Sequence, residues 1–491
     1  MLHLQHRYAS ISIENLQEVK NMELKKFTAV LLSASLLLSQ GAYLASYAIT
    51  ENQDAQKIEK KNIKKAKKNK KEKAEINKVD YINLDFWNNY NDDNLKYFIL
   101  RAVESNHDLK MAKENVNIYY EYVKMQRSRQ LPSIGLGGSP GYIKMMGTSD
   151  YDWMFLAPVF VNYEADIFLK NRDKTLLSKK DYELTLQDER AAYITVASSV
   201  GTVYFNILKL DKAIEIQEEI VNLRKEIYEL MKLSNEEGIT SIQDVIRADK
   251  AYINGKTALL NLEKQRLQLI NNLAVLVGAR PDDTGEFQYS DIENLNFSKE
   301  LSESYNSYAI DKRPDYLKAE LSLERSGIDI RVAKKEFLPS INISGMSIFN
   351  AGDLGSIFTA KNAIIGISGL IAGELFSGGR KMANLRVKKA EYEKMLQNYE
   401  KTNLTALQEL NDALVAIKHD KTKLNETIKQ NELEIKDYSL RELRFSEGVI
   451  SKLELIQSKE NLLSTKLLVL NNKADCFIDY IGLYKTLGAN I

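Results

Sequence analysis

The chain has 491 residues, of which 68 are Lys or Arg and 67 are Asp or Glu, so its formal charge is +1. Residues 1–79 hold 15 of the basic and 8 of the acidic groups, so the remainder is weakly acidic. This net charge argues against nucleic-acid binding, which needs clustered positive charge. A single Cys excludes an internal disulfide, and the sequence contains no catalytic grouping, metal-ligand spacing or phosphate loop, so we expect no enzyme, no cofactor and no metal site.

The N-terminal residues have the composition of an export signal. Two lysines precede an apolar run at residues 27–38, and small residues follow up to Ala48, after which we expect cleavage. The run is too short to span a bilayer as a helix, which takes about 20 residues. Residues 1–48 are therefore predicted to be a signal peptide, and a start at Met22 would make residues 1–21 a misassigned extension.

Residues 49–79 are rich in Lys and low in sequence complexity. A run of like charges repels itself and cannot bury an apolar core, so we expect a disordered linker. Binding to an anionic surface is the alternative interpretation of this segment.

A helix and two strands are predicted next. Residues 94–130 have the pattern of a helix, which Pro132 ends. Strands are expected at residues 133–144 and 153–165. In the second of them one face is apolar and the other becomes increasingly polar, as in a tilted membrane strand of about 9–11 residues.

A long helical hairpin follows the strands. Residues 169–233 contain no Pro and one Gly, which predicts a helix of about 65 residues, on the order of 100 Å long. We expect a turn at Gly238 and a returning helix at residues 241–277, where the leucines recur at coiled-coil spacing.

The same order of elements recurs after a polar connector at residues 279–304. Gly448 marks the turn of the second hairpin. The expected elements are a helix at 305–337, strands at 339–350 and 362–372, and helices at 380–445 and 451–487.

The two halves are an internal duplication. The letters LPSI open both strand segments, at Leu131 and Leu338, and the two turn glycines are 210 residues apart. The first repeat is residues 80–278, with strands in 133–165 and a tip near 238, and the second is residues 305–491, with strands in 339–372 and a tip near 448.

Four strands per chain cannot close a barrel that encloses water, because even small barrels need about eight. An open sheet cannot sit in lipid, because its edge N–H and C=O groups would lack partners. Chains must therefore share one barrel, and two chains would supply about 8 strands and three about 12. The predicted fold class is mainly helical, with long antiparallel coiled-coil helices in an α-barrel and a small membrane β-barrel.

Several motifs in this order resemble the TolC family of outer-membrane channel proteins, including its drug-efflux branch with NodT-like members. The first strand exit, Tyr163-Glu164-x-Asp166-x-Phe168 with Arg172, is similar to that of the family. The second exit, Phe376-x-Gly378-Gly379-Arg380, is also similar, as are the paired LPSI segments and the second hairpin tip, Arg444-Phe445-x-x-Gly448. The resemblance covers about residues 85–491.

The resemblance implies a homotrimer with a 12-stranded barrel in the outer membrane and a helical tunnel across the periplasm. It implies a passive exit duct of a tripartite efflux or type I secretion system, coupled to a periplasmic adaptor (a membrane fusion protein) and an inner-membrane pump. The alternative function is a structural coiled-coil surface protein or adhesin, which would explain the helices and the signal but not the duplicated strands.

The resemblance makes the hairpin tips the candidate adaptor-docking sites, and ordinary turns are the alternative interpretation. The tip residues are Gly238, Ile239, Arg444, Phe445, Gly448, Val449 and Leu453. Three copies of Asp244 and Glu454 would ring the tunnel entrance and favour cations, or would lie on a solvated coiled-coil face. Gln457 is the third candidate at the entrance and stands where the best-known family members have an acidic residue. Ile450 and Phe445 depart from the best-known family members, so we expect any latch between Asp244 and the second hairpin to use Lys452.

The strand–helix junctions are the last candidate sites. Glu164 and Asp166 would either line the lumen or cap the following long helix, whose N-terminus favours carboxylates. The other junction residues are Phe168, Arg172, Phe376, Gly378, Gly379 and Arg380.

Overall fold

The computed structural model describes residues 80–143, 152–299, 305, 307–351, 357–359, 361 and 363–490. They belong to one compact unit, Val79–Ile491. The expected signal peptide and linker, and the strand ends expected at residues 144 and 362, lie outside the described residues.

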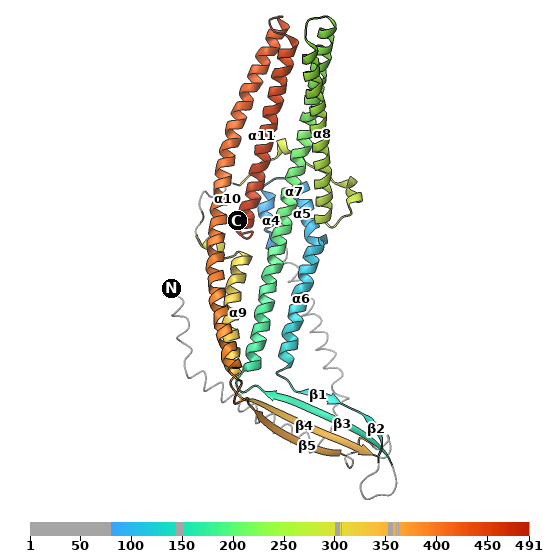
Figure 1. Cartoon of the computed structure of the whole chain (residues 1–491), viewed down its shortest axis with the longest axis vertical. Helices are drawn as coiled ribbons and strands as arrows, with labels where there is room; N and C mark the ends of the chain where they lie inside the picture. The colour runs from blue at the N-terminus through green and yellow to red at the C-terminus, as the bar shows by residue number, and fades with distance from the viewer. Residues whose placement is uncertain are drawn as a thin grey trace, which may run out of the picture. The chain divides into compact units, whose positions relative to one another are not determined.

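The described residues form long helices and one sheet (Figure 1), so the predicted fold class is confirmed. The α-helices are α4 (Leu84–Asn88), α5 (Asp93–Ser105), α6 (His107–Ser128), α7 (Lys170–Glu236), α8 (Ile242–Leu276), α9 (Pro314–Lys335), α10 (Arg380–Ser446) and α11 (Lys452–Thr486). The strands are β1 (Ser133–Leu136), β2 (Ser139–Ile143), β3 (Asp152–Ala165), β4 (Ser340–Ala351) and β5 (Ala363–Ala372). Short 3-10 helices are η1 (Asp80–Ile82), η2 (Pro281–Glu286), η3 (Ile292–Asn294) and η4 (Ser307–Ile310).

The sheet is antiparallel, in the order β1-β3-β4-β5, with β2 also paired to β3. We expected a single strand where β1 and β2 lie. The two pieces keep one register, because Leu136 pairs with Val159 and Ser139 with Leu156. Between them Gly137 N–H donates to Pro158 O at 2.8 Å, but Pro158 has no N–H to return the bond. The proline therefore interrupts the strand, and β1 and β2 lie one after the other along the same edge of β3.

The helix expected at residues 94–130 is also divided, at Asn106, whose φ and ψ are −59° and 132°. The Asn106 side chain accepts from Leu109 N–H at 3.0 Å, and its Nδ2 donates to Leu276 O at 2.8 Å. The start of α6 thus abuts the end of α8. The second repeat has the same joint, where Arg313 Nη1 at the start of α9 donates to Thr486 O at the end of α11, at 3.1 Å. In each repeat two short helices continue end to end beside the long one.

α7 lies at the centre of the helical layer. It packs against α6 and α8 on one side and against α9 and α11 on the other (Figure 1). Among the described elements, α10 packs against α9, α11 and the short η4. α7 contains an 18-residue window apolar enough to cross a membrane by composition, but 67% of that window is buried inside the protein. α7 is therefore the core helix of the helical layer.

The main apolar core lies where α7 meets α4, α5, α8 and α11. Its aromatic centre includes Trp87, Tyr90 and Phe205. The connector joins this core, which our expectation of a polar connector missed: Phe287, Ile292 and Leu295 are buried. Apolar residues spaced irregularly in a short polar segment give no periodic signal, so the sequence did not mark them.

Candidate functional site

The two hairpin tips have the same backbone construction. Gly238 and Gly448 have φ of +72° and +77°, the left-handed conformation that glycine adopts at helix C-termini. The following residue bonds back to the helix in each: Ile239 N–H to Ser234 O at 2.8 Å, and Val449 N–H to Arg444 O at 2.9 Å. Both turns close within their own chain segment and need no partner.

The tips expose apolar side chains. Ile239 is 77% and Val449 59% exposed, and Phe445 beside them is 37% exposed. Arg444 is exposed and Leu453 is half-buried. Apolar groups at the end of a hairpin, where no other described element covers them, mark a surface available to a partner.

Asp244 and Glu454 have a local role at the tips. Each is the third residue of a returning helix, and each backbone N–H bonds to the serine that caps that helix, Ser241 or Ser451. Ser241 Oγ also donates to Asp244 Oδ2 at 2.6 Å, and this bond, with Arg247 at 3.0 Å, lowers the pKa of Asp244. Glu454 completes a capping box by accepting from Ser451 N–H, whereas Asp244 binds the Ser241 hydroxyl. Gln457 lies exposed one turn beyond Glu454.

The latch expected between Lys452 and Asp244 stays a prediction, and no contact between these two residues is found among the described residues of this chain. Lys452 instead forms an ion pair with Glu226 of α7. Two more pairs join α7 to α11: Lys459 Nζ lies 2.5 Å from Glu219 Oε1, and Arg224 Nε donates to Glu460 Oε1 at 2.8 Å. We call these three pairs the hairpin clamp.

The sequence carried a signal for the clamp that we did not use. Glu219 and Glu226 are seven residues apart, as are Lys452 and Lys459. Opposite charges with equal heptad spacing on two antiparallel helices favour ion pairs between them.

At the first strand–helix junction the two acids have different roles. Asp166 accepts from Asn171 N–H at 3.0 Å and Arg172 N–H at 2.8 Å, so it caps α7. Glu164 lies on β3 and pairs with Lys170 Nζ at 3.0 Å. Phe168 is 37% exposed.

The second junction is built differently. Gly378 and Gly379 have φ of +57° and +83°, which turns the chain into α10. Glu374 pairs with Arg380 Nη2 at 2.7 Å rather than with the helix backbone, and Phe376 projects into solvent. The duplicated motifs therefore reach the same turn by different contacts.

Strand register sorts the sheet into two faces, since directly paired residues share a face. What we call the apolar face carries Ile134, Leu136, Val159, Val161, Tyr163, Ile343, Phe349, Ile365, Ile367 and Ile371. What we call the polar face carries, in its half next to the helices, Ser133, Asn162, Glu164, Asn342, Ser344 and Ser368. The far half of the polar face holds apolar residues, including Phe160 and Met346.

The apolar face has the height of a membrane. Tyr163 lies at its end next to the helices, and Tyr142 pairs with position 153, ten residues further along β3. Ten residues span about 33 Å, and a tilt of about 40° lowers this to about 25 Å, the height of the apolar band on outer-membrane strands.

The family model described as "Outer membrane efflux protein" matches residues 99–279 and 306–489. The chain belongs to the outer membrane efflux protein family. The resemblance found in the sequence is therefore confirmed, the chain is an efflux protein of the outer membrane, and the adhesin alternative is not favoured.

Named relatives agree with this family. The probable efflux pump outer membrane protein TtgC of Pseudomonas putida is 26% identical over 81% of this chain and 84% of its own length. The cation efflux system protein CusC of Escherichia coli O157:H7 is 25% identical, over 84% of this chain and 90% of its own.

Solved structures of outer membrane efflux proteins have the same fold. The Campylobacter jejuni CmeC outer membrane channel superposes with a TM-score of 0.73 at 21% identity, covering 82% of this chain and 88% of its own. The open state of the Neisseria gonorrhoeae MtrE outer membrane channel gives 0.70 at 23% identity, with 80% and 88% covered.

Proposed function

We propose that three copies of this chain form one duct across the outer membrane, which continues as a helical tunnel in the periplasm. The duct has no chemistry of its own and conducts cargo passively. A periplasmic adaptor couples it to an inner-membrane pump. The observation that carries this proposal is that, in the part of the chain that the structure describes, the sheet and the helical layer both end in unpaired edges.

The strand edges are β1 with β2 at one side and β5 at the other. In lipid the outer N–H and C=O groups of these strands need partners, which only another chain can supply. Eight-stranded barrels are filled by their own side chains, so two copies would leave little room for cargo. Three copies give about 12 strands, as the resemblance implies.

The helical edges carry exposed apolar rows. α8 exposes Ile246, Ile253, Leu260 and Leu267, which are seven residues apart. α10, at the opposite edge, exposes Leu404, Val415, Leu433 and Leu440. The heptad row of α8 and the apolar face of α10 have no partner among the described residues, which favours a coiled-coil seam between neighbouring copies.

The names of the relatives favour efflux over polypeptide secretion, since they describe an efflux pump and a cation efflux system. The exposed apolar groups at Ile239 and Val449 support the tips as the adaptor-docking sites. Asp244, Glu454 and Gln457 stand close behind the tips, where three copies would ring the entrance. The domain limits predicted from the sequence, with repeats at 80–278 and 305–491, fit this division into two hairpins.

The trimer can be tested at the helical seam. Leu260→Asp should separate the copies, because a carboxylate would be buried between helices. We expect the original protein to run as a trimer in detergent, by light scattering during size exclusion, and to conduct in planar bilayers. Asn261→Asp, a control at the neighbouring exposed position, should retain both properties. A monomeric original protein that still conducts would contradict the proposal.

The hairpin clamp can be tested as a gate. Lys452→Glu together with Lys459→Glu turns two attractive pairs into repulsive ones, and we expect a higher single-channel conductance. Lys466→Glu on the same helix is the matched control.

The selectivity of the entrance can be tested in the same bilayers. Asp244→Ala with Glu454→Ala should lower the preference for cations, and an unchanged selectivity would contradict their place at the entrance.

A further inference from the structure

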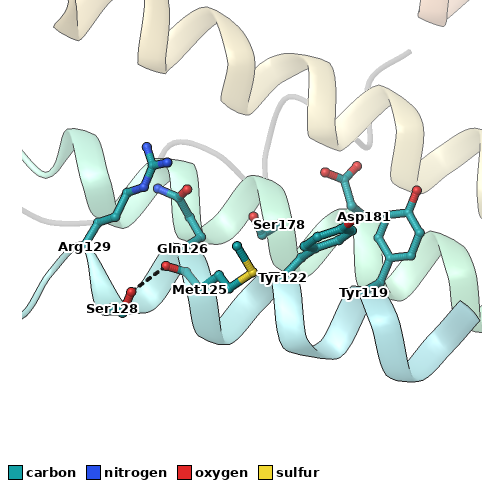
Figure 2. Close-up of a pocket in the computed structure, with 8 residues that line it drawn as sticks. All are labelled: Tyr119, Tyr122, Met125, Gln126, Ser128, Arg129, Ser178 and Asp181. Carbon is teal, nitrogen blue, oxygen red and sulfur yellow. Dashed lines mark hydrogen bonds between the residues drawn. The ribbon is translucent and has the colours of Figure 1, made fainter. Parts of the chain in front are cut away.

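A hollow of about 470 Å³ lies between α6 and α7, close to the sheet. Figure 2 shows its lining residues: Tyr119, Tyr122, Met125, Gln126 and Ser128 from α6, Arg129 directly after α6, and Ser178 and Asp181 from α7. The volume is within the range of small-molecule sites, about 300–1,000 Å³. None of the contacts that close the hairpins or the junctions uses it.

One end of the hollow is aromatic. The rings of Tyr119 and Tyr122 lie 5.6 Å apart at 88° to each other, so they form the corner of a box. The Met125 thioether lies on the same helix beside Tyr122 (Figure 2). Two perpendicular rings and a polarisable sulfur favour contact with a planar aromatic group.

The polar end of the hollow has an unbalanced set of groups. Arg325 neutralises Asp181, with its Nε donating to Oδ1 at 2.5 Å. Gln126 Nε2 is buried without a hydrogen-bond partner, and no ion pair or hydrogen bond of the Arg129 side chain is found among the described residues. Two donors remain, the buried amide of Gln126 and the exposed, charged guanidinium of Arg129, and an anionic acceptor suits both.

Helix geometry shows on which side of the wall the hollow opens. Lys170, Lys174, Ser178 and Asp181 recur at intervals of three and four, so they share one face of α7. Lys170 pairs with Glu164 on the polar face of the sheet. Gly201, which packs against Trp87 of α4, lies 20 residues beyond Asp181 and so about 200° round the helix. The hollow therefore opens on the side of the polar face, opposite the side that α4 covers.

We propose that this hollow binds planar aromatic anions, with their rings against Tyr119 and Tyr122 and their carboxylate on Arg129 and Gln126. If the polar face lines the duct, as the proposed function has it, the site lies in the wall of the conducting path. The duct would then contact one class of cargo directly.

Three naphthalene probes of equal ring area separate the chemistry: 2-naphthoate, 2-naphthylmethanol and 2-naphthylmethylammonium. We measure their binding to the purified protein in detergent by equilibrium dialysis, with empty micelles as the blank. Binding should be tightest for 2-naphthoate. Arg129→Gln should weaken naphthoate about five- to tenfold and leave the alcohol unchanged, and Tyr122→Leu should weaken all three about fivefold. Arg127→Gln, two residues away outside the hollow, is the control.

Equal binding of the three probes, or equal loss with Arg127→Gln and Arg129→Gln, would overturn the site. Its placement is tested separately in planar bilayers, where 2-naphthoate should lower the conductance of the original protein and spare Arg129→Gln. Naphthoate binding with no change in conductance would overturn the placement in the duct and leave the site itself standing. A protein that neither conducts nor forms trimers would contradict the proposed function instead.

Discussion

α7 and α10 are copies of one helix in two different surroundings. Both have 67 residues and stand 210 residues apart. Buried residues occur along α7 from Asn171 to Ile220, whereas α10 buries three: Ala406, Leu410 and Thr427. α7 has neighbours on both sides and α10 on one. Duplication therefore repeats the backbone, while the place of each copy in the layer decides which side chains it must bury.

The difference also shows in residue type at matching positions. Phe205 in α7 is buried in the aromatic core, and its counterpart in α10, Val415, is 56% exposed. An apolar residue exposed on an edge helix is a cost to a lone chain, and burial against another copy would remove it. The exposed half of α10 is thus evidence about the assembly.

The largest expected effect is at Gly201 of α7. A Cβ there would lie 2.7 Å from Trp87 Cζ3 and 2.8 Å from Ile481 Cδ1. Gly201→Leu should lower the free energy of unfolding by about 3 kcal/mol through overpacking. Asn411→Leu, the matching position on exposed α10, should change it by about 0.5 kcal/mol or less. Thermal unfolding of both variants checks this, and similar losses would contradict the contrast between the helices.

A carboxyl pair gives the second contrast. Asp420 on α10 and Asp479 on α11 stand where the first repeat has Leu210 and Leu269. Burial, the hydrogen bond with Asp420 and the charges of Asp420 and Asp475 together raise the pKa of Asp479 to about 7, with burial the largest cause. In the unfolded chain this carboxyl has its ordinary pKa of 3.8.

The sign follows from linkage. Between about pH 4 and pH 7 the unfolded chain releases the proton and the folded chain keeps it, so stability falls as pH rises and is constant above about pH 7. The full shift corresponds to about 4 kcal/mol, which solvent screening at this half-buried site lowers to about 2 kcal/mol. Asp479→Asn should flatten the decline in melting temperature across this window. Asp412→Asn, at an exposed site on α10, should leave the decline in melting temperature unchanged. An equal dependence of melting temperature on pH in both variants would be evidence against a proton held by this pair.

The smallest effect compares the two strand–helix junctions. Asp166→Ala removes the cap of α7 and should cost about 1 kcal/mol. Glu374→Ala removes exposed ion pairs and should cost about 0.3 kcal/mol. Chemical denaturation of the two variants measures the difference. Equal costs would mean that Glu374 also stabilises its helix terminus.

Much of the fold could be predicted because its signals are local. A long run without Pro and with one Gly predicted the length of α7, and turn glycines predicted both hairpin ends. The strand-exit motifs indicated the protein family. Asp166 could not be assigned from sequence, because the same acid suits a cap or a lumen.

The features that sequence analysis missed depend on residues far apart in the chain. The break at Asn106 contains no Pro or Gly and is fixed by Leu276, 170 residues away. The gap between β1 and β2 requires knowing that Pro158 faces Gly137. The hollow could not be predicted, because Arg129 and Gln126 can be recognised as donors without acceptors only once α6 and α7 are known to lie side by side.

The joints at Asn106 and Arg313 have a consequence for how such a wall changes in evolution. Each joint connects two helix ends by a hydrogen bond from a side chain to a carbonyl, with no shared backbone. Whole heptads could be inserted between a joint and a tip, in both helices of a hairpin. Such an insertion would not change the pairing register of the strands at the other end. The length of the helical hairpins could therefore change by insertion or deletion of heptads, while the size of the strand segment stays constant.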